Sequence, residues 1–184
     1  FGLAMVTLVA ASQKLGLTEG TALVIPWAIF LGALAQLFAS FKDAQKNNIF
    51  GTTVFGAYGF FWLGVAMTWM IQNGVFGEAM AAKADVRQLG VAFIGYFIFS
   101  MGATLVAAET NKHLFIVMCF IDLLFLGLFC SVLGIMEHEM HLLAAYSELI
   151  ISLLAFYGAI AHLANNHFGR VFLPIGKPFG IFKK

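Results

Sequence analysis

The chain has 184 residues, of which 61% are hydrophobic and only 10% are charged. A soluble domain has about 45–50% apolar and 25% charged residues, so this composition excludes a water-soluble globular protein. The net charge of +1 and the lack of a basic run also argue against binding to nucleic acid. The chain is therefore predicted to be an all-α integral membrane protein with a single domain, residues 1–184.

The apolar stretches predict six transmembrane helices. A helix that crosses the hydrocarbon core of a bilayer needs about 20 apolar residues. Five stretches reach that length, and the shorter stretch 1–12 is interpreted as the remaining part of a truncated first helix. The polar tail 165–184 follows the last helix. The predicted helices cover residues 1–12, 21–41, 51–72, 87–108, 112–134 and 141–164.

The basic residues of the short loops predict the orientation of these helices. Cytoplasmic loops carry an excess of Lys and Arg. One side of the predicted bundle holds three such residues, Lys14, Lys83 and Arg87, and the other side holds seven. Both termini lie on the richer side and are predicted to be cytoplasmic. The seven residues are Lys42, Lys46, Lys112, Arg170, Lys177, Lys183 and Lys184.

Polar side chains crowd the start of helix 51–72, where Asn47 and Asn48 precede Thr52 and Thr53. A helix N-terminus has unpaired N–H groups and a positive dipole, and such ends bind carboxylates in transporters. The alternative is local structure. An asparagine at this position is a favoured N-cap, and a threonine hydroxyl can bond to a carbonyl one turn earlier.

Two polar side chains lie deeper. Gln36 is about fifteen residues into helix 21–41, where its amide must face either a pore or another helix. Tyr58 is two turns into helix 51–72, further from the membrane surface than the tyrosines that anchor helices at the interface. Its depth favours a position in a pore or in a packed interior.

Two carboxyl groups fall within predicted helices. Asp122 is near the middle of helix 112–134, where an aspartate costs about 2.5–3.5 kcal/mol on insertion scales. Glu148 is eight residues into helix 141–164, and the two helices run in opposite directions, so both carboxyls are expected at comparable depths. Such groups are often proton relays, so we predict that they take up protons and let an anion pass. For each, the alternative is a hydrogen bond between helices.

Four segments in chain order resemble the acetate uptake transporter family, which includes bacterial succinate–acetate permeases and yeast acetate carriers. The chain opens with Phe-Gly, as the first helix of the family does. "FLGALAQLFASF" at 30–41 is similar to the family's second-helix pattern, and "NNIFGTTVFGAYGFFWL" at 47–63 resembles its signature. "FGRVFLPIG" at 168–176 matches its C-terminal motif. The family's Asn-Pro-x-Pro-Leu-Gly motif is not among the 184 residues.

The resemblance implies proton-coupled transport of acetate and other small carboxylates, with succinate as a further candidate substrate. It also implies a homohexamer in the cytoplasmic membrane with a central pathway in each protomer. By position, the family's aromatic and aliphatic constriction corresponds to Phe1, Tyr58 and either Phe120 or Ile121.

Other functions stay open or are disfavoured by the residues. The segment "EHEMH" at 137–141 spaces its histidines by three, whereas a His-Glu-x-x-His zinc site spaces them by four, so no metal or other cofactor is predicted. The sequence shows no pairing of a nucleophile with a base, so an enzyme is not predicted. The alternatives are a gradient-independent channel for acetate or for a neutral solute such as urea or ammonia, and a membrane-anchor subunit of a redox complex.

Overall fold

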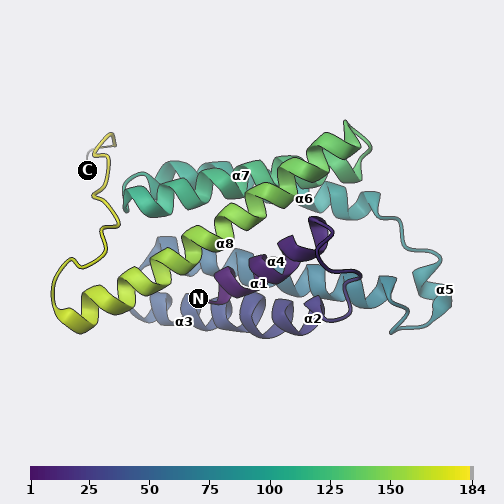
Figure 1. Ribbon diagram of the computed structural model, residues 1–184, viewed down its shortest axis with the longest axis horizontal. Coiled ribbons are helices and arrows are strands. Elements are labelled where there is room, and N and C mark those ends of the chain that lie inside the picture. Colours follow the sequence, from purple (N-terminus) through teal and green to yellow (C-terminus); the bar gives the residue numbers. More distant parts are fainter. Residues whose placement is uncertain (183–184) are drawn as a thin grey trace.

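The computed structural model describes residues 1–182, and every regular element in that range is helical (Figure 1). Five helical stretches in this part of the chain are long and apolar enough to cross a membrane. One of these is a continuous rod, residues 24–45, that contains a π-helical segment. The elements are α1 (Gly2–Lys14), α2 (Val24–Trp27), η1 (Ala28–Leu34), α3 (Ala35–Gln45), α4 (Ile49–Gln72), α5 (Glu78–Ala81), α6 (Arg87–Ala107), α7 (Lys112–Val132) and α8 (Glu137–Phe168).

The five long helices lie where the hydrophobic stretches predict them, but α8 is four residues longer at each end than the predicted 141–164. Glu137 and Glu139 occupy its first turn, where acidic side chains interact favourably with the positive end of the helix dipole. Gly169 ends α8 with a left-handed conformation at φ 62° that glycine adopts without strain. The polar flanks of α8 are therefore helical, although they add nothing to the hydrophobic span.

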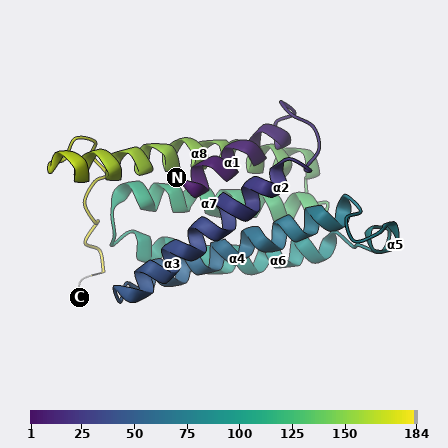
Figure 2. The same cartoon turned by 90° about the horizontal axis from the view of Figure 1, so that it is seen from below.

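The short helix α1 packs against α8 and against the rod of residues 24–45 (Figure 2). Its 13 residues rise about 20 Å, less than the roughly 30 Å of a hydrocarbon core. Gly2 makes the close approach to the rod possible, because a Cβ at this position would collide with the carbonyl oxygen of Leu31. One face of α1 therefore meets the centre of the bundle.

The long helices form two packed groups, one containing α3 and α4 and the other containing α6, α7 and α8. Tyrosine hydroxyls cross-link the groups where α4 approaches α6. Tyr58 Oη donates to Ser100 Oγ at 2.9 Å, and Tyr96 Oη donates to the carbonyl oxygen of Ala57 at 3.2 Å. These buried bonds fix α4 against α6 across the middle of the bundle.

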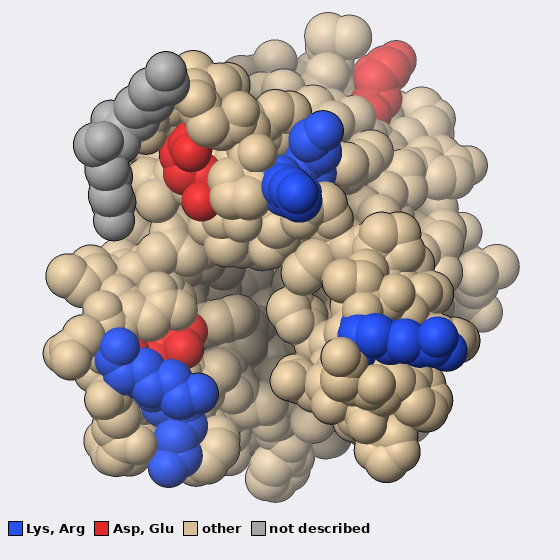
Figure 3. Space-filling model, turned by 90° about the vertical axis from the view of Figure 1, so that its left-hand side faces the viewer, with Lys and Arg blue, Asp and Glu red and all other residues tan. Residues whose placement is uncertain are grey.

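One end of the bundle carries most of the basic side chains, which surround a hollow (Figure 3). This end combines the C-termini of α3 and α8 with the N-terminus of α7 (Figure 1). The described residues of the predicted cytoplasmic group that belong to this end are Lys42, Lys46, Lys112, Arg170 and Lys177. Lys183 and Lys184, which were counted with them, lie outside the described residues.

The C-terminal segment after α8 is held against this basic end by backbone hydrogen bonds. The N–H of His113 donates to the carbonyl oxygen of Ile175 at 3.0 Å, and the N–H of Phe179 donates to that of Ala108 at 2.9 Å. Asn165 Oδ1 accepts from the N–H groups of Phe172 and Leu173. The motif at residues 168–176 therefore ends α8 and turns the chain back toward α6 and α7.

Candidate functional site

A cavity between the helices lies toward the end of the bundle where α1 finishes and α8 begins. It has a volume of about 220 Å³, and side chains from α1, α4, α6, α7 and α8 form its walls. Most of the wall is aromatic or aliphatic. The polar exceptions are Gln13, Lys14, Gln72, Ser131, His141 and Glu148. We call this space the vestibule.

A second, much smaller cavity adjoins the vestibule nearer the middle of the bundle. Phe61, Trp62 and Leu124 line both spaces, so they mark the junction. The inner cavity measures about 20 Å³, which is roughly enough for one water molecule. We call it the constriction. The rest of its wall is formed by Leu3, Thr7, Tyr58, Ile121, Phe125 and Ile151.

Aromatic packing keeps the constriction narrow. The rings of Phe61 and Phe125 meet edge to face with centroids 5.2 Å apart, and Tyr96 stacks on Phe125 at 5.7 Å. Phe61 also meets Trp62 edge to face at 5.4 Å. Each ring is therefore held by another ring, and widening the constriction requires several large side chains to move together.

The structure brings Tyr58 and Ile121 to the constriction, but it places two other expected residues elsewhere. Phe1 is 68% exposed and contacts Phe156 edge to face, so its assignment to the constriction is corrected. Leu3 and Thr7, one turn apart on α1, occupy that wall instead. Phe120 is only half-buried and does not line the constriction, because its neighbour Ile121 is on the inner face of α7.

Two hydroxyl side chains of α6, Ser100 and Thr104, bond separately to Tyr58 and to Asp122. Tyr58 is 5% exposed and donates to Ser100 Oγ at 2.9 Å. Thr104, one turn after Ser100 on α6, has its Oγ1 2.9 Å from the carbonyl oxygen of Ser100 and 2.8 Å from Asp122 Oδ2. A hydroxyl has one proton, so Thr104 can donate to only one of these acceptors. If Asp122 is protonated, it donates to Thr104 Oγ1 while Thr104 donates to the carbonyl oxygen of Ser100, and both bonds form at once.

Asp122 also has an oxygen without a partner. Its Oδ1 is buried, and it is the one buried side-chain nitrogen or oxygen within residues 1–182 that has no hydrogen bond. A buried acceptor left without a donor costs about 1–3 kcal/mol, more when charged. The arrangement therefore offers a place for a proton or a hydrogen-bond donor between α6 and α7.

Glu148 has a different environment from Asp122. Its side chain is 2% exposed, and its Oε2 accepts from Lys14 Nζ at 2.8 Å, an ion pair between α8 and α1. Asp122 points instead to Thr104 on α6. The two carboxyls therefore do not face one another: Glu148 lines the vestibule, whereas Asp122 bonds to α6 and lines neither the vestibule nor the constriction.

The polar residues at the start of α4 serve the helix itself. Asn48 is the N-cap, with Oδ1 accepting from the N–H of Gly51 at 3.3 Å, and Thr52 Oγ1 donates to the carbonyl oxygen of Asn48 at 2.8 Å. Thr53 is exposed on the outer surface. Asp43 lies so close to Gly51 that a Cβ there would collide with its carboxylate. A resident carboxylate thus occupies the helix end that was predicted to bind a substrate anion.

Gln36 is buried, but its amide is used within its own helix. Its Nε2 donates to the carbonyl oxygen of Gly32 at 2.8 Å. The side chain does not line the vestibule or the constriction. Its burial agrees with the interpretation that a deep amide avoids lipid, but the partner is the preceding turn rather than a second helix or a pore.

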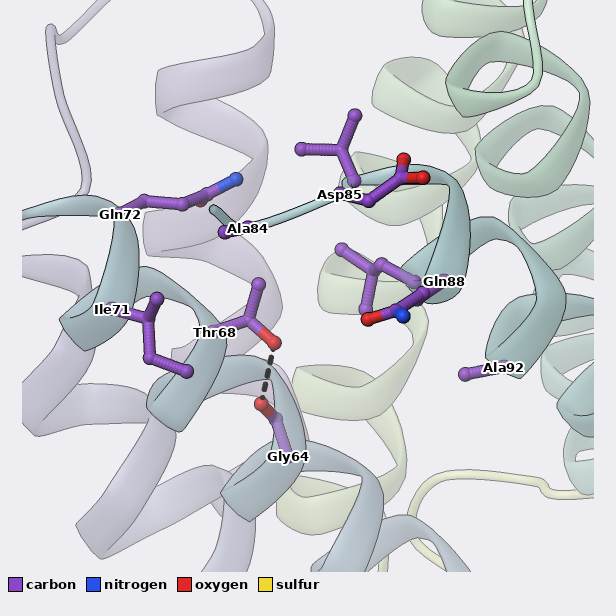
Figure 4. Close-up of a pocket in the computed structure, with 10 residues that line it drawn as sticks. Gly64, Thr68, Ile71, Gln72, Ala84, Asp85, Gln88 and Ala92 are labelled. Carbon is purple, nitrogen blue, oxygen red and sulfur yellow. Dashed lines mark hydrogen bonds between the residues drawn. The ribbon is translucent and has the colours of Figure 1, made fainter. Parts of the chain in front are cut away.

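A groove on the outside of the bundle adjoins the vestibule. It has a volume of about 310 Å³ and separates the outer end of α4 from the start of α6 (Figure 4). Figure 4 shows Gln72 on one side and Asp85 and Gln88 on the other. The hydrogen bonds of Arg87 lower the pKa of the Asp85 carboxyl to about 2. Because Gln72, Val86 and Leu89 line both spaces, the groove leads toward the vestibule.

Sequence reasoning missed Lys14, Ser100 and Thr104. Lys14 was counted as a loop cation, although it ends the helix whose inner face includes Leu3 and Thr7. Ser100 and Thr104 are spaced by four residues in an otherwise apolar helix, and this spacing indicates a polar stripe on one face. This spacing could be recognised in the sequence, but the helices that the two hydroxyls contact could not be predicted from it.

These features define a multi-pass helical membrane protein with two adjoining cavities, the smaller of which lies nearer the middle of the bundle. The chain belongs to the GPR1/FUN34/yaaH family, whose model matches residues 1–176. It is 28% identical to the succinate-acetate/proton symporter SatP of Escherichia coli (strain K12) over 96% of this chain and 91% of that protein. Acetate permease A of Emericella nidulans is 24% identical, with 94% of this chain and 62% of that protein covered.

The fold also matches a solved structure. The structure titled as that of the bacterial acetate channel SatP superposes with a TM-score of 0.86 at 27% identity, covering 95% of this chain and 94% of that one. The names of these relatives describe transport proteins rather than enzymes.

Proposed function

We propose that this protein transports acetate and other small carboxylates, including succinate, across the cytoplasmic membrane through the vestibule and the constriction. The observation that carries this proposal is the pair of adjoining cavities of about 220 Å³ and about 20 Å³, the smaller of which lies between Tyr58, Ile121 and their aromatic neighbours. The apolar wall favours a solute that can shed its water, and a small carboxylate does so at a lower cost when it meets a proton or a cation on the way.

Proton coupling is the second part of the proposal. Asp122 follows Ile121 of the constriction wall along α7, with one oxygen unpaired and the other bonded to Thr104 of α6. A carboxyl in this position repels an anion when it is charged and stops repelling it when it is protonated. A proton on Asp122 therefore makes passage of the anion easier, which links the two movements.

We further propose the arrangement of the protein in the membrane. α1 counts as a sixth transmembrane element that lines the pathway, both termini are cytoplasmic, and six copies form a hexamer with a pathway in each protomer. The excess of basic side chains at one end of the bundle supports the orientation. Cysteine accessibility at each end tests the sidedness, and native mass spectrometry of the detergent complex tests the hexamer.

Labelled acetate flux into liposomes, with and without an imposed pH gradient, tests the transport function. Wild-type protein is expected to show saturable uptake that an inward proton gradient accelerates. Asp122→Asn is expected to retain uptake but to lose the acceleration, and Tyr58→Ala is expected to admit larger carboxylates. Non-saturating uptake that ignores the gradient in the wild type would favour the channel alternative, whether for acetate or for urea or ammonia.

The redox-anchor alternative makes a different prediction, namely a haem-bearing, coloured protein. The structure offers no support for it, because His113 Nε2 is 2.9 Å from the carbonyl oxygen of Leu154 and is engaged in the packing of α7 against α8. The absorption spectrum of the purified protein decides the question. A haem band in this spectrum would favour the redox-anchor function over transport.

A further inference from the structure

The Lys14–Glu148 ion pair sets the vestibule apart from the rest of the molecule. Of the two ion pairs within residues 1–182, the Asp85–Arg87 pair is exposed to solvent. In the Lys14–Glu148 pair the two side chains are 13% and 2% exposed. Replacing such a buried pair by apolar residues often leaves stability unchanged or improves it, so the pair is weak evidence for a stabilising role. Its position in the wall of the internal cavity suggests a role in binding.

Lys14 is the one cation that lines the vestibule. Its ammonium group carries three N–H donors, and Glu148 Oε2 accepts one of them at 2.8 Å. A carboxylate is the natural partner of a lysine ammonium group in this low-dielectric space. At about 220 Å³, against roughly 30 Å³ for a water molecule in the liquid, the vestibule has room for a two-carbon carboxylate and several waters.

We propose that Lys14 is a carboxylate-binding group of the vestibule and that Glu148 is its resident competitor, displaced by substrate when Glu148 is protonated. This inference rests on the proposed transport function and assigns it a substrate site. In the resting state the ammonium and the Glu148 carboxylate neutralise one another. When Glu148 takes up a proton, it releases Lys14, and the substrate carboxylate takes its place. One proton and one anion enter together, and the site is electrically neutral before and after.

Glu148 is the one acidic side chain among the residues that line the vestibule. From α1 it faces Lys14, and on its own helix His141 lies two turns earlier. His141 Nε2 is 3.0 Å from the backbone oxygen of Lys14, so its ring is bonded to backbone rather than to the carboxylate. The walls from α4, α6 and α7 contribute Gln72 and Ser131 as their polar side chains, and none of their lining residues titrates as an acid or a base near neutral pH.

The test is the KM for labelled acetate in proteoliposomes between about pH 5.5 and 8, expressed per acetate ion. In the wild type, KM is expected to rise with pH, because deprotonated Glu148 occupies Lys14. Glu148→Gln frees Lys14 permanently, so KM should become independent of pH and be roughly 10- to 100-fold lower than in the wild type at pH 8. A wild-type pH profile in Glu148→Gln would overturn the proposal.

The matched control is Lys14→Gln/Glu148→Gln, which contains no uncompensated buried charge and keeps the inference testable if Glu148→Gln does not fold. Its KM should be high at every pH. A wild-type KM and pH profile in this double variant would mean that the pair is structural only.

A second measurement separates this inference from the proposed function. Acetate binding to the purified protein in detergent, followed by the line width of a ¹³C-acetate NMR signal, does not require transport. If the wild type moves no acetate, the transport function fails, and tighter acetate binding by Glu148→Gln would still support a site at Lys14. If the wild type transports acetate but the wild type and Glu148→Gln bind acetate equally tightly, only the inference of a carboxylate site at Lys14 fails.

Discussion

The two intramembrane carboxyls differ in their partners. Glu148 is buried and paired with a cation from another helix, and it faces a cavity. Asp122 is half-buried and bonded to a neutral hydroxyl, and it keeps one oxygen without a partner. Both look alike in the sequence, as single acids in apolar helices. Their contacts give Glu148 a cationic partner for its carboxylate at rest, whereas Asp122 has no such partner.

The largest expected effect comes from breaking the ion pair on one side. Lys14→Met leaves the Glu148 carboxylate buried and unpaired, which should destabilise the protein by about 3–5 kcal/mol. Thermal unfolding of the detergent-solubilised protein, followed by tryptophan fluorescence, measures the change. Lys14→Met/Glu148→Leu, which removes both charges, should recover most of the loss. A single variant as stable as the wild type would show that Glu148 is already neutral.

The corresponding change at Asp122 should have a smaller effect. Thr104→Val removes the hydroxyl that bonds Oδ2, so both oxygens of Asp122 lack a protein donor, at an expected cost of about 1–3 kcal/mol. Thr104→Val/Asp122→Leu removes the donor and the acceptor together and should restore stability. If the single variant lost as much stability as Lys14→Met, Asp122 would be charged in the folded protein, and the contrast between the two carboxyls would disappear.

Tyr58→Phe should have a smaller effect again, because it removes one hydroxyl but keeps the aromatic ring. The lost bond to Ser100 is expected to cost about 1 kcal/mol, and the constriction should keep its size. The relative flux of acetate and larger carboxylates should therefore stay at the wild-type ratio, whereas Tyr58→Ala should change it. A changed ratio in Tyr58→Phe would show that the hydroxyl, and not the ring, selects the solute.

The smallest effect is expected at the N-terminus of α4. Asn48→Ala removes the cap and should cost about 0.5–1 kcal/mol at this exposed position, with no change in the KM for acetate. Asn48→Asp, which keeps a capping oxygen, is the matched control. An increase in KM in Asn48→Ala at unchanged stability would return this helix end to the list of substrate-binding sites, despite the Asp43 carboxylate that lies over it.

The membrane class and the positions of the long helices could be predicted because they depend on local properties of the chain. A stretch such as 112–134 is apolar over a whole bilayer thickness, and no tertiary partner changes that. The ends of the helices were less predictable. α8 begins and ends at backbone turns, with Met136 and Gly169 in left-handed conformations, rather than where hydrophobicity falls.

The candidate site was predictable in part. Tyr58 and Ile121 were named from their resemblance to a family pattern, and they line the constriction. Phe1 was named in the same way and lies on the surface, because a pattern of residues does not fix which face of α1 turns inward. Gln36 and Thr52 were candidates because polar groups in apolar helices need partners, and their partners proved to be carbonyls of their own helices.

The sequence alone determined that this chain is a membrane protein of long helices, since apolar length and the scarcity of charge depend on no contact between distant residues. It also showed that Asp122 and Glu148 must be sheltered from lipid. Only the tertiary structure decided what shelters them, because Lys14 and Thr104 come from other helices whose rotation and depth no local pattern records. The partner of a buried charge determines its chemistry, and the packing of the helices determines which residue that partner is.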